Sequence, residues 1–345
     1  MTLLYFILIL GVIVFIHELG HFIFAKKSGI YVYEFSIGMG PRILKWNRKN
    51  DETDYCLRLF PIGGFVQMAG EEIDDDKSIP KDKKFSVKTF GQKFMTVIAG
   101  IMMNFILAIV LLFIVGLING APQNKTTIGV VDPDYPAYTA GLEVGDEILK
   151  VNGRNANTND KLTLQLQVFQ GEPITFEVNR DGQIKDITVT PIEETENGEV
   201  VYKYGIQIQD DVEHGVLPAL EYAFTKTFSL IHQMLFIVFY LITGQLDLGS
   251  LSGPVGIYSV VDSAAASGFL SLLYLTAYIS INVGFINFLP IPAFDGGRIL
   301  FLIIEKIKGK PVDPKLENTI HTVGFFLLIA LMILITYNDV IRLIK

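Results

Sequence analysis

The sequence has almost no cysteine and no excess of basic charge, and each shortage excludes a class of protein. Cys56 is the only cysteine among 345 residues, so a disulfide framework and a thiolate zinc cluster are both excluded. Nothing in the sequence pairs this thiol with a base, and we expect a buried structural cysteine. The net charge is −8, and the lack of a basic face argues against nucleic acid as a partner.

Long apolar runs are plentiful, because hydrophobic residues make up 50% of the chain. The main runs are residues 3–24, 95–118, 217–242, 270–304 and 323–337. A helix needs about 20 residues to cross a bilayer. We therefore predict a polytopic α-helical membrane protein with about four transmembrane helices. The polar stretch between the second and third runs is long enough for one soluble domain.

The first apolar run contains only three ionisable side chains, His17, Glu18 and His21. Such groups are costly at membrane depth and indicate a functional site. His17 and His21 lie one helical turn apart, so they share a face and can hold a zinc ion, while Glu18 can accept a proton from water on that ion. The run has no basic start and no small-residue cleavage site, and we interpret it as a retained helix, not a signal peptide.

A catalytic zinc site needs a third protein ligand and an open position. Asp295 is the best candidate, because a carboxylate in an apolar segment is costly unless a metal or a proton neutralises it. Pro290 and Pro292 precede it and are expected to unwind the helix. Irregular backbone at membrane depth is tolerated where it lines a cavity.

Residues 126–211 predict a β-rich domain. Short β-branched strands at 128–131, 175–178 and 187–190 are separated by turn residues. Residues 135–153, with an Ala-Gly-Leu step and an Asn-Gly turn, resemble a PDZ domain. That resemblance implies capture of peptide C-termini by strand addition. A spacer or size filter that binds no peptide is the alternative.

The motifs as a set resemble the site-2 intramembrane zinc metalloproteases, specifically the branch of the bacterial regulator-of-sigma-E protease. The resemblance rests on His-Glu-x-x-His at 17–21, on Asn-x-x-Pro-x-Pro-x-x-Asp-Gly at 287–296, and on segments 63–66, 100–104 and 252–256. Phe294 and Ile101 depart from the usual pattern without removing a ligand. The resemblance implies a Zn²⁺ cofactor on His17, His21 and Asp295.

The same resemblance implies roles for further residues. Glu18 is the general base, and Asn287 holds the substrate backbone or steadies the transition state. Asn104 is either an auxiliary polar group or a partner in an interhelical hydrogen bond. Residues 55–60 and 65–68, with a turn at 61–64, are expected to form a hairpin that pairs with an unwound substrate; a cytoplasmic hairpin that only covers the site is the alternative. The auxiliary positions are Asn104, Pro290, Pro292, Gly63, Gly64 and Phe65.

Charge predicts the topology, because basic residues cluster after the first run and before the second, which places that loop in the cytoplasm. Residues 217–242 contain Glu221, Lys226 and His232, and this suits an amphipathic helix on the outer face. The expected regions are 1–120 (first membrane half), 121–213 (extracytoplasmic PDZ-like domain), 214–266 (amphipathic helix and linker) and 267–345 (second membrane half). The protein is expected in the bacterial plasma membrane, with its active site toward the cytoplasm.

The leading hypothesis is an endopeptidase that cuts single-span membrane proteins already trimmed by another protease. By resemblance the substrates are anti-sigma factors and remnant signal peptides. A membrane-anchored peptide adaptor without zinc is a second hypothesis, and the intact ligand set argues against it. A metal transporter would need more polar residues in its spans. His214, His232 and His321 lack partners at ligand spacing, and the acidic run 71–76 predicts a solvated loop.

Overall fold

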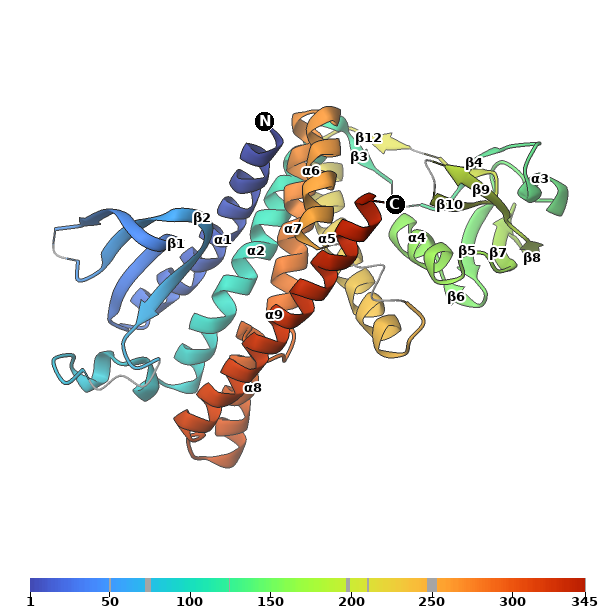
Figure 1. The fold of residues 1–345 in the computed structure, drawn as a ribbon. Helices are drawn as coiled ribbons and strands as arrows, with labels where there is room; N and C mark the ends of the chain where they lie inside the picture. The colour runs from blue at the N-terminus through green and yellow to red at the C-terminus, as the bar shows by residue number, and fades with distance from the viewer. Residues whose placement is uncertain are drawn as a thin grey trace. The chain divides into compact units, whose positions relative to one another are not determined.

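The computed structural model describes residues 1–49, 51–71, 76–123, 125–196, 199–209, 211–246 and 253–344. The chain divides into two compact units (Figure 1). The helical unit comprises Met1–Leu111 and Ser252–Ile341, and the β-rich unit comprises Leu112–Leu251 and Arg342–Lys345. Of the predicted motif 252–256, residue 252 lies outside the described residues, as do residues 72–75 of the acidic run.

The helical unit is built around long apolar helices. Its helices are α1 (Thr2–Lys27), α2 (Phe90–Asn119, which continues into the β-rich unit), α6 (Pro254–Ser267), α7 (Phe269–Phe288), α8 (Asp295–Lys308) and α9 (Pro314–Ile344), with short 3-10 turns at Lys81–Lys83 and Phe85–Val87. Within the described residues, α1, α2, α7, residues Lys315–Asp339 of α9, and α5 (Val216–Ile242) are long and apolar enough to cross a membrane. The predicted fold class is confirmed, with α5 as a fifth candidate span.

Helix α6 corrects the predicted linker, because residues 254–267 form a helix that packs into the helical unit. Val261 of α6 is buried with Ile9 and Ile13 of α1 and with Leu272 of α7. Thr2 donates a hydrogen bond of 2.5 Å to Asp262. Helix α6 therefore packs beside the first half of α1. Helix α7 runs parallel to α1, toward its histidines. The segment is short, and its length alone does not distinguish a packed helix from a linker.

The sheet of the helical unit differs from the predicted hairpin. Strands β1 (Val32–Asn47) and β2 (Asp54–Met68) are long and bent, and residues 34–37 of β1 pair with both ends of β2. Phe35, for example, lies opposite Val66 on one side and Tyr55 on the other. The segments 55–60 and 65–68 therefore flank β1 and do not pair with each other. The register is determined by the pairing of β2 with β1. The turn residues at 61–64 give no indication of this pairing.

The β-rich unit follows the predicted order of strands. It contains α3 (Pro136–Ala140), α4 (Asn159–Val168), and strands β3 (Ala121–Pro122), β4 (Ile128–Val131), β5 (Glu147–Val151), β6 (Arg154–Asn155), β7 (Ile174–Arg180), β8 (Gln183–Val189), β9 (Ile192–Glu196), β10 (Glu199–Lys203), β11 (Ile206–Ile208) and β12 (Val212–Glu213). The main sheet has the order β6-β5-β7-β8, and β11 pairs with β4. Asn152 and Gly153 both have positive φ, as a tight turn between β5 and β6 requires. Cys56, in the other unit, is buried in β2 as expected.

Helix α5 is fastened along its length to the β-rich domain. Lys226 pairs with Asp160 of α4 at 2.6 Å, and the hydroxyl of Tyr240 lies 3.3 Å from the amide nitrogen of Gln165. Arg154 stacks over the Tyr240 ring at 5.1 Å. These contacts join α5 and the domain into a single unit.

Candidate metal centre and substrate cavity

The three predicted ligands converge at one point in the helical unit. The Nε2 atoms of His17 and His21 are 3.1 Å apart, and Asp295 Oδ2 lies 3.0 Å from the first and 3.3 Å from the second. Both histidines are 8% exposed. Within the described residues, these three side chains are the group of metal-ligating residues that the structure brings together. His214, His232 and His321 are not part of this group.

One face of α2 orients both histidines. The Nδ1 atom of His21 lies 2.9 Å from the carbonyl oxygen of Thr96, and the Nδ1 atom of His17 lies 3.3 Å from the side-chain amide of Asn104. A ring nitrogen facing a carbonyl must carry the proton, so Nε2 of His21 keeps its lone pair for a metal. Asn104 is fully buried. The predicted auxiliary residue therefore contacts a predicted ligand directly.

The unsatisfied atoms at this point fit a zinc ion. Asp295 Oδ2 is buried and makes no hydrogen bond within the described residues, and the same holds for Asn104 Oδ1. Turning the Asn104 amide over places its oxygen on the Nδ1–H of His17, and Nε2 of His17 then also keeps a lone pair. Four-coordinate zinc with ligands at 2.0–2.1 Å has ligand atoms about 3.3 Å apart, close to the separations found here. The donor set and its spacing suit zinc.

Asp295 reaches the histidines because the chain turns sharply between α7 and α8. Residues 289–294 are not helical, and Asp295 begins α8. The backbone of Gly296 passes so close to that of Leu289 that an added Cβ would lie 2.6 Å from the Leu289 carbonyl carbon. Pro290 and Pro292 lie within this unwound segment, as predicted. The turn brings α8 back against α2, where Ile299 packs on Val97 and Ile101.

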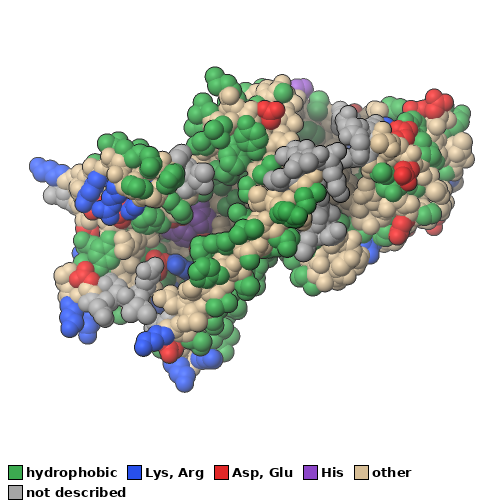
Figure 2. Space-filling model, viewed as in Figure 1, with side chains coloured by type: hydrophobic (Ala, Val, Ile, Leu, Met, Phe, Trp, Pro, Cys, Tyr) green, Lys and Arg blue, Asp and Glu red, His purple; other side chains and the backbone are tan. Residues whose placement is uncertain are grey.

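A cavity of about 970 Å³ opens beside the three ligands. Its lining includes Glu18, Asn287 and residues 63–68 of β2. A Cβ added to Gly64 would lie 3.2 Å from Cγ of Glu18, so this strand passes directly over the predicted base. In Figure 2 histidine side chains are visible in a hollow of the helical unit. The predicted residues Gly63, Gly64 and Phe65 therefore line the same cavity as the ligands.

An ion pair in the lining of the cavity was not predicted from the sequence. Glu71, which we assigned to a solvated loop, pairs with Arg298 of α8, and both residues line the cavity. Asp76, at the other end of that acidic run, accepts a hydrogen bond of 3.0 Å from Tyr33 and also lines the cavity. Composition predicted solvation because an acidic run has no local signal for a partner 227 residues away. The pair joins the turn that follows β2 to the helix that begins with Asp295.

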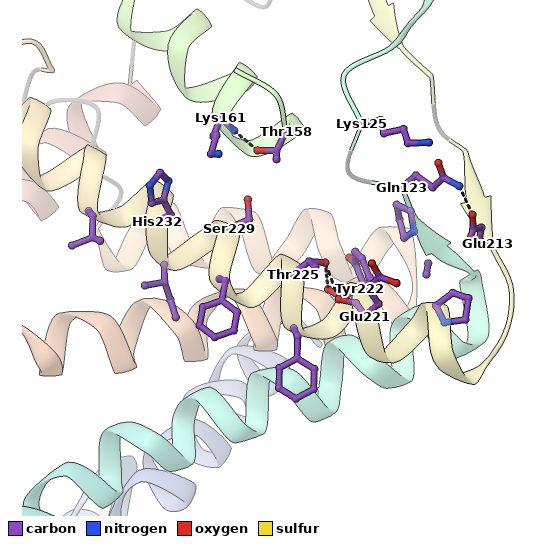
Figure 3. Close-up of a pocket in the computed structure, with 17 residues that line it drawn as sticks. Gln123, Lys125, Thr158, Lys161, Glu213, Glu221, Tyr222, Thr225, Ser229 and His232 are labelled. Carbon is purple, nitrogen blue, oxygen red and sulfur yellow. Dashed lines mark hydrogen bonds between the residues drawn. The ribbon is translucent and has the colours of Figure 1, made fainter. Parts of the chain in front are cut away.

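A second cavity, of about 920 Å³, lies within the β-rich unit. Figure 3 shows Lys161 and Thr158 on one side of it, facing Ser229 and His232 of α5. Helix α5 thus presents a polar flank to the domain. The described residues around this cavity contain no cluster of metal-ligating side chains.

Known proteins resemble this chain over nearly all its length. The model of peptidase family M50 matches residues 5–331. The zinc metalloprotease RasP of Geobacillus kaustophilus (strain HTA426) is 33% identical, covering 98% of this chain and 97% of that protein. The regulator of sigma-W protease RasP of Bacillus subtilis (strain 168) is 33% identical over 99% of both chains, and a putative zinc metalloprotease of Clostridium perfringens (strain 13 / Type A) is 36% identical over 99% of both. The chain therefore belongs to peptidase family M50, as its motifs indicated.

Proposed function

We propose that this chain is a zinc-dependent intramembrane endopeptidase whose metal is held by His17, His21 and Asp295. The observation that carries the proposal is the convergence of these three side chains beside Glu18, in a cavity walled by a β-strand. When bound, zinc supplies a Lewis acid that acidifies a water and polarises the scissile carbonyl. Membership of the family and the zinc metalloproteases among its relatives support the same assignment.

Glu18 has the position for a general base. It lies in the first helix next to His17, and its side chain lines the cavity beside the ligands. It accepts a proton from the attacking water and passes it to the leaving amide nitrogen. Asn287 lines the same cavity from α7, where its amide can donate a hydrogen bond to the substrate backbone or to the developing oxyanion.

The strand over Glu18 provides a place for an unwound substrate. Residues 64–68 pair with β1 on one side, and no second strand pairs with their other side within the described residues. Residues 63–68 line the cavity. A substrate segment added at this edge gains backbone hydrogen bonds in an extended conformation, which exposes the amide that a helix conceals. The register differs from the predicted hairpin, but the edge for strand addition is retained.

The position of α5 supports an orientation on the membrane surface. Its contacts with the domain run from Lys226 to Tyr240, so most of the helix follows a polar domain that a bilayer does not accommodate. Its opposite side is exposed and apolar, at Leu217, Phe224, Phe228, Leu235, Phe239 and Ile242. An amphipathic helix in the interface, not a fifth span, satisfies both faces.

The remaining placement follows from charge and from the exposed apolar surface. Basic residues after α1 support a cytoplasmic location for that end of the helix, with the ligands near it and the β-rich domain outside the cell. The exposed apolar side chains of α9 suit contact with lipid, namely Val323, Phe325, Phe326, Leu327, Ile333 and Leu334. The substrates we propose are single-span proteins, such as anti-sigma factors trimmed outside by another protease, and remnant signal peptides. The β-rich domain binds their new C-termini or excludes bulky ectodomains.

The test compares two variants of the purified protein in lipid. Glu18→Gln is expected to keep zinc and lose cleavage of a model transmembrane substrate, because the ligands remain while the base is gone. Asp295→Ala is expected to weaken both zinc binding and cleavage. Full cleavage by Glu18→Gln would contradict the role of Glu18 as the base. Wild-type protein that binds no zinc and whose cleavage is unaffected by chelators would contradict the role of the metal.

A further inference from the structure

The segment that carries Asp295 contains one strained residue. Ala293 has φ +83°, in the left-handed region that a side chain disfavours. It lies between α7 and α8, two residues before the metal ligand. A residue in this conformation persists only where surrounding contacts hold it, and such residues concentrate at functional sites. The contacts that hold Ala293 therefore also determine where Asp295 points.

Helix α9 supplies those contacts. The backbone N–H of Ala293 donates a hydrogen bond of 3.1 Å to Nδ1 of His321. The His321 ring packs against Phe301 of α8, with ring centroids 5.6 Å apart. One turn further along α9, a Cβ added to Gly324 would lie 2.5 Å from Cβ of Pro292. Residues three apart share a helix face, so one face of α9 contacts two successive residues of the segment.

The chemistry of this hydrogen bond defines the state of the imidazole. An N–H donor requires a lone pair on Nδ1, so the ring is neutral and its proton is on Nε2. Nε2 is buried and has no hydrogen-bond partner within the described residues. Only Nδ1 therefore links His321 to the segment. An asparagine places its Oδ1 where the Nδ1 of histidine lies, which makes it the matched replacement.

We infer that His321 is a positioning residue for the metal centre. It does not contact the metal, and it acts through the backbone of Ala293 to keep Asp295 directed at His17 and His21. The inference rests on the proposed zinc site and extends it to α9. Without the acceptor, Ala293 relaxes toward negative φ, and the carboxylate of Asp295 turns away from the histidines.

The test uses the full chain in lipid, with His321→Leu, His321→Asn and the control Thr322→Leu. Thr322 is exposed, and its hydroxyl bonds within its own helix to the carbonyl of Asn318. Zinc affinity is measured by competition with a chelator, and kcat and KM with a model transmembrane substrate. We expect His321→Leu to lose about tenfold or more in zinc affinity, the usual effect of losing an outer partner of a metal site, and to lower kcat more than KM. His321→Asn and Thr322→Leu are expected to stay within about threefold of wild type.

Each result bears on the inference. Equal zinc affinity in His321→Leu and His321→Asn overturns it, whether both match wild type or both are weak, because the acceptor is then irrelevant. If His321→Leu does not fold, His321→Ala takes its place in the comparison with His321→Asn. Wild-type protein without zinc contradicts the proposed function itself, whereas zinc-loaded wild type with insensitive His321 variants contradicts only this inference.

Discussion

The contact between α1 and α2 yields a sharp prediction at Gly100. This residue faces His21 across the two helices, and a Cβ built on it would lie 2.6 Å from Cε1 and 2.9 Å from Cδ2 of the imidazole, with Nε2 closer still. Ordinary contacts between carbon atoms begin near 3.5 Å. Gly100→Ala must therefore displace the His21 ring, or the helix that carries it, by about 1 Å.

The size of that shift determines the expected result. Metal sites accept deviations of only about 0.2 Å in ligand distance, so a shift of about 1 Å exceeds the tolerance several times. We expect zinc affinity to fall about 100-fold and cleavage by a similar factor. The overpacking itself costs about 1–3 kcal/mol of folding free energy, which a domain of this size survives.

The assay measures zinc affinity by chelator competition and the rate of cleavage of a model transmembrane substrate. Gly91→Ala is the matched control, because it lies in the same helix and an added Cβ there meets no atom within 4 Å. Gly91→Ala is expected to behave as wild type. A Gly100→Ala protein that binds zinc with wild-type affinity and cleaves normally would refute the placement of His21 against α2.

Further predictions concern the support of the site and of the β-rich domain. Asn104→Leu removes the partner of His17 Nδ1, and chelator competition is expected to show zinc binding weaker by about tenfold. Glu71→Arg repels Arg298 and is expected to raise KM about threefold to fivefold, while adding Arg298→Glu recovers part of the loss; failure of the double variant to recover would disprove the pairing. Burial tends to raise the pKa of Asp146, but hydrogen bonds from Arg180 and from the Glu143 backbone outweigh it and hold the pKa below its ordinary value. Because the folded pKa is the lower one, this carboxylate stabilises the domain above about pH 4 and loses that effect as pH falls further. Protection against hydrogen exchange in the β-rich unit, corrected for the pH dependence of intrinsic exchange, is expected to fall below about pH 4 in wild type and to change less in Asp146→Asn.

The parts of the site that the sequence predicted are those with a local physical cause. His17 and His21 share a face because the helical period places them there. Asp295 could be identified because a carboxylate in an apolar segment needs a partner. The strands 128–131 and 175–178 of the β-rich domain follow from composition and turn residues, and both are present in the structure. Membership of the family, the enzyme class and the zinc cofactor are supported by relatives that cover almost the whole chain.

The parts that were missed depend on contacts between distant segments. The two ends of β2 pair with the same stretch of β1, and no local turn signal encodes a strand that is shared in this way. Glu71 belongs to an acidic run by composition, and only the fold brings Arg298 beside it. His321 lacks a partner at ligand spacing, and this spacing did not reveal its hydrogen bond to the Ala293 backbone. A hydrogen bond between a side chain and the backbone cannot be inferred from the spacing of side chains in the sequence.

One long-range contact could nevertheless have been predicted from the sequence, namely that of α2 with the two histidines of α1. Thr96, Gly100 and Asn104 are spaced by four residues on α2, the same step that separates His17 from His21 on α1. In an antiparallel pair of helices these positions meet in reverse order, and Thr96 indeed contacts His21 while Asn104 contacts His17. Gly100 lies between them, where only a missing side chain leaves room for the imidazole. Two neutral imidazoles in lipid need two fixed partners for their Nδ1 atoms and space between those partners. A span that packs against such a histidine pair without supplying a metal ligand is therefore expected to carry a polar–small–polar pattern at four-residue steps.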